Sequence, residues 1–124
     1  MVEFTINQAN IDNWFTANGN DYDGNNPTSD DIIKLTENVT LSSNVFIALP
    51  AGVTFDGQGF TIDLGSATID GLFTTGGTDL SSGSVVKNLG VLGGSLNDNA
   101  GFIIRSSQKY FTVENCYSTG DIIK

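Results

Sequence analysis

The sequence predicts an all-β fold: a short parallel β-helix of three to four coils with a capping α-helix at its N-terminal end. Short apolar runs are separated almost everywhere by Gly, Asn, Asp or Ser, as is typical of strands joined by turns. Parts of the chain repeat with a period near thirty residues, which indicates a solenoid. We expect a single domain over residues 1–124, with the capping helix and a loop in 1–31 and the coils in 32–124.

The first element after the short strand-like segment VEFTI is an expected helix in NQANIDNWFTANG, residues 7–19. Asn7 suits the N-cap and Gly19 suits the C-terminal stop. Ile11, Trp14 and Phe15 follow i, i+3, i+4 spacing and form one apolar face. We predict that this face covers the exposed end of the first coil; the alternative is a Trp14 that stacks on a ligand.

From Ile32 onward the pattern becomes that of strands, most of them only three to six residues long. A turn-rich polar loop over residues 18–31 precedes them. The expected strands are Ile32–Leu35, Val39–Leu41, Val45–Leu49, Val53–Phe55, Phe60–Leu64, Thr68–Phe73, Val85–Leu89, Gly101–Ile104 and Phe111–Cys116.

The repeat is clearest where VKNLGVLGG aligns with VENCYSTGD, so that Asn88 and Asn115 lie 27 residues apart. In a β-helix, equivalent residues of successive coils stack on one another. We therefore expect an asparagine ladder of Asn88 and Asn115, with Leu89 over Cys116 inside the solenoid. Phe73 over Ile103 is a further expected interior stack, and TFDGQGFTIDL resembles an earlier, degenerate coil. The consensus of leucine-rich repeats is absent.

Residues 100–121, AGFIIRSSQKYFTVENCYSTGD, resemble the GLUG-type repeat of bacterial surface and adhesin-like proteins. Residues 70–94 resemble it more loosely, with Leu-Gly-Val in place of Cys-Tyr-Ser. The helix followed by residues 32–63 is similar to the N-terminal cap and first coils of right-handed parallel β-helices of the pectate-lyase-like class. Similar repeat-rich chains occur in large DNA viruses. The resemblance implies a right-handed solenoid and an extracellular, cell-surface or virion-surface location.

Composition excludes several functions. Five basic against fourteen acidic side chains give a formal charge of −9, which argues against nucleic acid and anionic membranes as partners. The absence of His excludes the usual zinc sites and catalytic triads, and one Cys excludes an intramolecular disulfide. No apolar run is long enough for a transmembrane helix, and no signal peptide is expected in this chain.

Asp56, Asp63 and Asp70 are spaced seven apart, and paired carboxylates could serve a glycosidase. Because Asp-Gly is a common turn dipeptide, turn formation is the favoured interpretation. Arg105 and Lys109 could supply the base of a lyase but are interpreted as a solvated loop. We expect no cofactor and no built metal site. The one alternative is Ca²⁺ held by the loop of Asp21, Asp23, Asp30 and Asp31 as a site outside the EF-hand class, because the EF-hand register fails there.

The C-terminal coil has no obvious cover in the sequence. Cys116 is interpreted as a buried small residue, and Val113, Ile122 and Ile123 add apolar surface to the end. Because exposed strand edges template further pairing, we expect self-association through this coil as a dimer, or a longer β-helix that continues it.

Two functions remain as hypotheses. The first is a non-catalytic structural or adhesion module whose polar faces bind a glycan, a protein or another copy. The alternative is a fragment of a polysaccharide hydrolase or lyase, although the low coil count and few basic residues favour the module.

Overall fold

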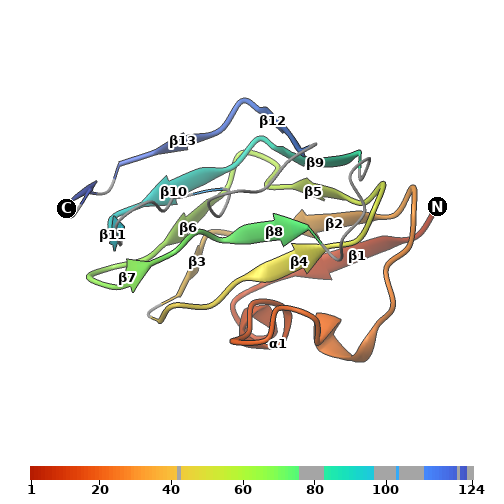
Figure 1. Cartoon of the computed structure of the whole chain (residues 1–124), viewed down its shortest axis with the longest axis horizontal. Helices are drawn as coiled ribbons and strands as arrows, with labels where there is room; N and C mark the ends of the chain where they lie inside the picture. The colour runs from red at the N-terminus through yellow and green to blue at the C-terminus, as the bar shows by residue number, and fades with distance from the viewer. Residues whose placement is uncertain (42, 76–82, 97–102, 104–110, 120, 123–124) are drawn as a thin grey trace.

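The computed structural model describes residues 1–41, 43–75, 83–96, 103, 111–119 and 121–122. The fold is a parallel β-solenoid of about three turns with one short α-helix among these residues (Figure 1). The expectation of a mostly β, coiled repeat structure is therefore confirmed. The elements are β1 (Glu3–Ile6), α1 (Ile11–Trp14), the 3₁₀ turn η1 (Tyr22–Gly24), β2 (Ile32–Leu35), β3 (Val39–Thr40), β4 (Ile47–Leu49), β5 (Thr54–Asp56), β6 (Thr61–Asp63), β7 (Thr68–Ile69), β8 (Phe73–Thr75), β9 (Ser84–Lys87), β10 (Gly90–Leu92), β11 (Ser95–Leu96), β12 (Phe111–Glu114), β13 (Tyr117–Ser118) and β14 (Asp121–Ile122).

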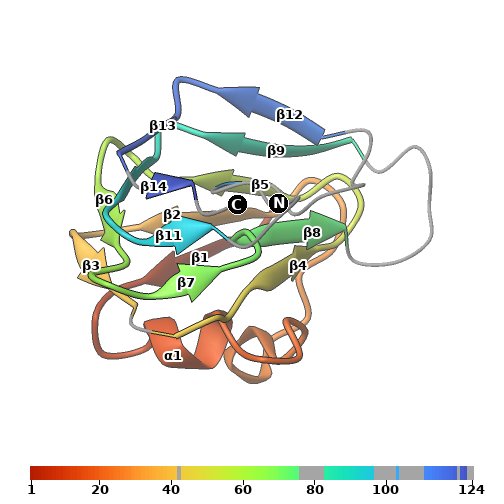
Figure 2. The ribbon, with the colours of Figure 1, turned by 60° about the vertical axis from the view of Figure 1, so that its left-hand side comes forward.

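The strands form four parallel sheets that run along the solenoid axis. Their orders are β1-β2-β5-β9-β12, β13-β10-β6-β3, β14-β11-β7 and β4-β8. Successive turns of the chain place a new strand on the equivalent strand of the turn before, so most hydrogen-bonded neighbours are far apart in sequence. Figure 2 shows β12, β9, β5, β2 and β1 as one stack, with α1 at the opposite end from β12.

Register sets which side chains point inward. In the first sheet Ile33 pairs with Phe55, Phe55 with Val86, and Val86 with Val113. The first three are fully buried, whereas Val113 in the last coil is 44% exposed. The pairing of Val86 with Val113, and of Gly90 with Tyr117, is the register that the 27-residue repeat predicts. Phe73 N–H also donates to the Ile103 carbonyl at 2.8 Å, so these two positions are adjacent as expected.

The helix is shorter than predicted. It covers Ile11–Trp14 rather than most of residues 7–19, because Phe15 turns to an extended conformation and Thr16 bridges Phe46. Asn7 still satisfies backbone donors, since its Oδ1 accepts from the amides of Ala9 and Asn10. Gly19, at a φ of +73°, belongs to a later turn in which a Cβ would overlap the Phe46 ring.

The three apolar residues of this segment are buried, with Ile11, Trp14 and Phe15 each at most 1% exposed. The Trp14 ring lies between those of Phe4 and Tyr22, at centroid distances of 5.6 and 6.5 Å. Phe15 reaches deeper and packs with edge-to-face geometry on the rings of Phe55 and Phe73.

Several strand predictions need correction. Residues Thr68–Phe73 are not one strand: β7 ends at Ile69, and a bend at Asp70 followed by Gly71, at a φ of +122°, precedes β8. The predicted strand ending at Leu89 stops at Lys87, where Asn88 adopts a left-handed conformation. The prediction also missed β10, β11, β13 and β14, whose two or three residues show too little alternation to be recognised alone. Of the expected strand Gly101–Ile104, only Ile103 lies among the described residues.

Candidate functional site

One corner of the solenoid, between the first and second sheets, is built from stacked polar side chains. Asn88 and Asn115 lie there with φ values of +56° and +52°, a conformation that Asn adopts more easily than most residues. Asn115 Nδ2 donates to Asn88 Oδ1 at 3.3 Å, and Asn88 Nδ2 donates to Asp56 Oδ1 at 3.2 Å. The structure thus places the two asparagines in contact and extends the row to Asp56. We call Asp56, Asn88 and Asn115 the amide row.

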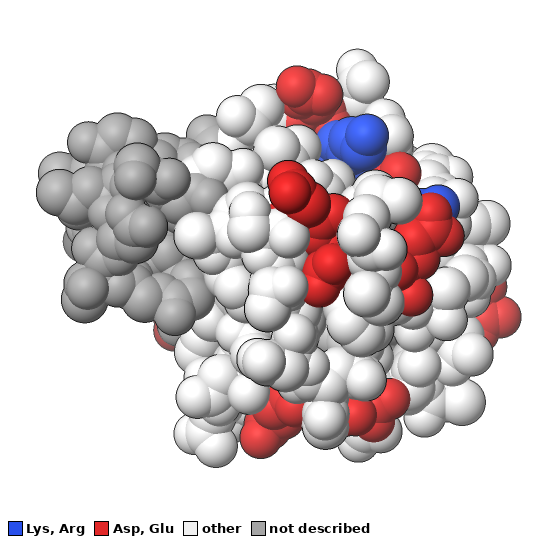
Figure 3. All heavy atoms as spheres, turned by 90° about the vertical axis from the view of Figure 1, so that its right-hand side faces the viewer, with Lys and Arg blue, Asp and Glu red and all other residues white. Residues whose placement is uncertain are grey.

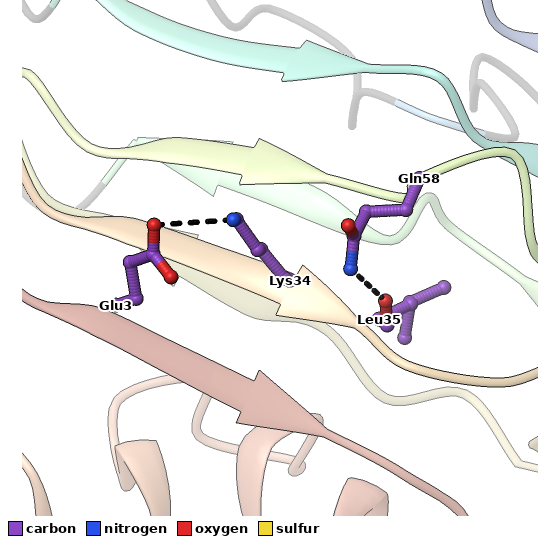
Figure 4. Close-up of polar contacts among 4 residues, drawn as sticks. All are labelled: Glu3, Lys34, Leu35 and Gln58. Carbon is purple, nitrogen blue, oxygen red and sulfur yellow. Dashed lines mark hydrogen bonds and ion pairs between the residues drawn. The ribbon is translucent and has the colours of Figure 1, made fainter.

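The coil that holds Asp56 makes the same type of contact with the coil before it. Gln58, also left-handed at a φ of +53°, donates from Nε2 to the Leu35 carbonyl at 2.7 Å (Figure 4). Gln58 N–H donates to Asp56 Oδ1 at 2.9 Å. Gly57 between them lets the coils approach, because a Cβ there would lie 2.5 Å from the Asn88 carbonyl oxygen.

Beside this corner, the outer face of the first sheet presents charges of alternating sign. Lys34 pairs in register with Asp56, Asp56 with Lys87, and Lys87 with Glu114. Lys34 Nζ also lies 3.1 Å from Glu3 Oε1, in an ion pair that Figure 4 shows. Figure 3 shows a face on which the few basic side chains lie among acidic ones. The sequence analysis did not predict this row, because it depends on coils of different length.

A shallow hollow of about 530 Å³ lies on the same corner. Its lining includes one exposed aromatic side chain, Tyr117, which is 53% exposed. The Tyr117 ring reaches back over Gly90, where a Cβ would overlap it. Sequence analysis missed Tyr117; the available signal was its alignment with a glycine in the preceding repeat. The lining residues are Asp56, Gln58, Gly59, Asn88, Leu89, Gly90, Asn115 and Tyr117.

The three spaced aspartates serve in turns and in contacts between coils. Asp63 Oδ1 accepts from the Gly65 amide at 2.8 Å, as Asp56 accepts from Gln58. Asp70 and Asn44 exchange two hydrogen bonds across coils. These contacts agree with the interpretation of the aspartates as turn residues. Arg105 and Lys109 lie outside the described residues.

The four acidic residues of the proposed calcium loop do not form one cluster. Asp31 is only 5% exposed as a residue, and its carboxylate accepts from the backbone amides of Thr28 and Val2, both at 2.9 Å. These amides, Thr28 first, hold the pKa of Asp31 below its usual value. Asp21 and Asp23 instead line a separate shallow hollow of about 270 Å³. Among the described residues, no three acidic or Cys side chains are grouped so that they could hold a metal.

At the C-terminal end, Cys116 is half-buried, with Sγ 3.2 Å from the Glu114 carbonyl oxygen. Burial raises the pKa of this thiol, which disfavours the reactive thiolate. Val113 is exposed on the same coil. Ile122 belongs to β14, but its side chain, like all of Ile123, lies outside the described part of the chain.

Comparison with protein-family models, curated proteins and solved structures finds no match for this chain. The class of the protein is therefore defined by its geometry: a parallel β-solenoid with repeating coils. Within the described residues, no helix has the length and apolar character needed to cross a membrane.

Proposed function

We propose that this chain is a non-catalytic structural module of the adhesion type, which associates through its C-terminal coil with a second copy of itself. The observation that carries this proposal is the difference between the two ends. The strands β12, β13 and β14 each pair only with the preceding coil in the described structure, and the inward-facing Val113 is 44% exposed. At the other end, the equivalent row begins at Phe4, which packs against Trp14.

A second copy fits this end better than an open stack. Because α1 covers the N-terminal end, a C-terminal coil cannot pair head to tail with the first coil of another molecule without displacing it. A two-fold contact between C-terminal coils closes after two copies, whereas head-to-tail contacts would continue into fibres. A further coil of a longer β-helix is the other partner that would match the same strand edges.

The resemblance to GLUG-type repeats and to right-handed parallel β-helices supports a surface role of this kind. Asn88 and Asn115, which occupy the same position of the repeat in the two segments that carry this resemblance, stack on one another. A non-catalytic role is also consistent with the carboxylates, because Asp56 and Asp63 are already engaged by the backbone of their own turns.

Sedimentation velocity at micromolar concentration tests the association. We expect a dimer that dissociates on dilution, and Val113→Glu should shift the population to monomer. An exposed residue at another corner, Ser66, offers the matched variant Ser66→Glu, which should leave the dimer intact. A wild-type chain that remains monomeric at all concentrations would contradict the proposal.

A reducing-sugar assay on a panel of plant and bacterial polysaccharides tests the non-catalytic role. We expect no release of reducing ends. Release that disappears in Asp56→Asn would instead support the alternative, a fragment of a polysaccharide hydrolase or lyase.

A further inference from the structure

We infer that the hollow beside the amide row is a binding site for a neutral saccharide, with Tyr117 as its stacking platform. The inference rests on the proposed adhesion role and names its ligand class. It depends on three features of the hollow: an exposed ring held in a defined place, free polar atoms beside it, and a balanced local charge.

The Tyr117 ring can take its position because Gly90, which lies beneath it, has no side chain. Gly90 pairs in register with Tyr117, and a Cβ on Gly90 would overlap the end of the ring. Glycine therefore lets Tyr117 lie back along the corner, toward the preceding coil and away from the open C-terminal end. A half-exposed ring so placed offers its electron-rich face to the C–H groups of a sugar ring.

The polar residues that line the hollow beside Tyr117 have hydrogen-bonding capacity left over. Asp56 Oδ1 accepts from Gln58 N and Asn88 Nδ2, whereas Oδ2 accepts no bond from the described residues. Gln58 Oε1 and Asn115 Oδ1 are likewise without a donor among these residues, and each amide nitrogen has a second N–H. Sugar hydroxyls both donate and accept, so they can use carboxylate and amide groups together.

Charge selects against ionic ligands. The formal charge of −9 on the whole chain repels anions, such as a uronic acid. Lys34 and Lys87 pair in register on either side of Asp56 and offset the negative charge of its carboxylate, which disfavours a cation. The volume of about 530 Å³ lies in the range of small-molecule sites, and its open shape suits one or two rings of a longer glycan.

The test is a titration of the ¹⁵N-labelled full chain followed by NMR, with cellotriose, maltotriose and chitotriose as neutral probes. We expect saturable shifts of the side-chain amide signals of Asn88 and Asn115 with at least one probe. Tri-galacturonic acid, as the anionic counterpart, should bind more weakly. The absence of saturable shifts at these signals for all three neutral probes would overturn the inference.

Two variants alter the platform in different ways. Tyr117→Ala removes the ring, and Gly90→Ala keeps the ring but displaces it; each should weaken binding about tenfold, as expected for loss of one stacking contact. Tyr117→Phe should retain most of the affinity, and Val113→Ala, on the same coil, should retain all of it. Wild-type affinity in both Tyr117→Ala and Gly90→Ala would also overturn the inference.

Sedimentation of Tyr117→Ala separates this inference from the proposed function. If the wild type and the variant both dimerise but the wild type binds no sugar, the saccharide site is wrong and the proposed structural role stands. If the wild type binds sugars but never associates, the proposed dimer is wrong and the saccharide site stands.

Discussion

At the residue scale, three left-handed residues define one corner of the solenoid. Gln58, Asn88 and Asn115 all have φ near +55° and each sends its amide side chain to a neighbouring coil. The conformation turns the chain between two sheets, and the side chain bonds along the axis. A residue with a side-chain amide therefore serves both the local turn and the contact between coils at each of these three positions.

Asn88 allows these two roles to be measured separately. Asn88→Gly keeps the left-handed backbone but removes the bonds to Asp56 and Asn115, and should cost about 0.5–1.5 kcal/mol in unfolding free energy. Asn88→Ala should cost about 1–2 kcal/mol more, because a Cβ disfavours the left-handed conformation. Chemical denaturation of both variants measures the difference; equal stabilities would show that the backbone conformation contributes little.

Asp31 predicts a pH dependence with a defined sign. Its carboxylate accepts from the amides of Thr28 and Val2, which lowers its pKa in the folded state. A lowered folded pKa gives stability that is fully present above the unfolded pKa of about 3.9 and is lost as pH falls through the folded value. We expect the unfolding free energy to fall with acidification below about pH 4.

Asp31→Asn isolates this group from the other carboxylates. The variant should be less stable than the wild type at neutral pH, because an amide has only one oxygen for two backbone donors. The difference in unfolding free energy between the two chains should become smaller as the pH falls. A constant gap across the acid range, measured by urea denaturation, would show that Asp31 contributes nothing to the pH dependence.

At the element scale, the N-terminal end is closed by α1 and by a single side chain. β3 pairs with β6 on one side, and its outer edge is not paired with another strand in the described structure. Instead Gln8 Oε1 accepts from the Thr40 amide at 2.7 Å, and Gln8 Nε2 donates to the Thr40 carbonyl at 3.2 Å. The side-chain amide thus takes the place of a neighbouring strand and protects the edge.

Trp14 tests how much the helical cap contributes. Trp14→Ala should cost about 3–5 kcal/mol, because the indole is buried between Phe4 and Tyr22. Trp14→Phe should cost much less, since it keeps an aromatic ring and removes the Nε1–H, which is buried without a partner in the described structure. Denaturation by guanidinium measures both, and a small effect of Trp14→Ala would mean that the cap is not needed for folding.

At the scale of the whole molecule, the two ends of the solenoid differ in how far their strands and core are covered. One end is covered by aromatic packing. At the other end, β12, β13 and β14 each have an edge that no described strand pairs with, and Val113 is exposed. A contact that forms only between folded chains stabilises the folded state by mass action. The proposed dimer therefore has a thermodynamic consequence in addition to its size.

We expect the unfolding temperature of the wild type to rise with protein concentration. The Val113→Glu variant should lose this dependence, because a buried unpaired carboxylate opposes association. Differential scanning calorimetry at several concentrations measures both chains. A wild-type unfolding temperature that is independent of concentration would contradict the dimer.

The sequence by itself determined the features in which similar residues of successive coils stack on one another. The 27-residue repeat predicted the register of Val86 on Val113, and the spacing of Ile11, Trp14 and Phe15 predicted an apolar face near the start. Such features are visible because stacked coils impose similar residues at equivalent positions. Turn chemistry predicted many of the breaks between strands for the same reason, since each corner needs residues that tolerate its backbone conformation. The breaks at Asp70 and at Asn88 were not predicted.

Only the tertiary structure decided which unlike residues meet. Coils of unequal length bring Lys34, Asp56, Lys87 and Glu114 into one row. Side-chain packing, which the repeat does not specify, lays the Tyr117 ring over Gly90. The short strands β10, β11, β13 and β14 exist because neighbouring coils pair with them, and their own pattern is too brief to predict them. The end of α1 is likewise set by Phe15 turning into the core. These choices depend on contacts across coils, which no local sequence pattern specifies.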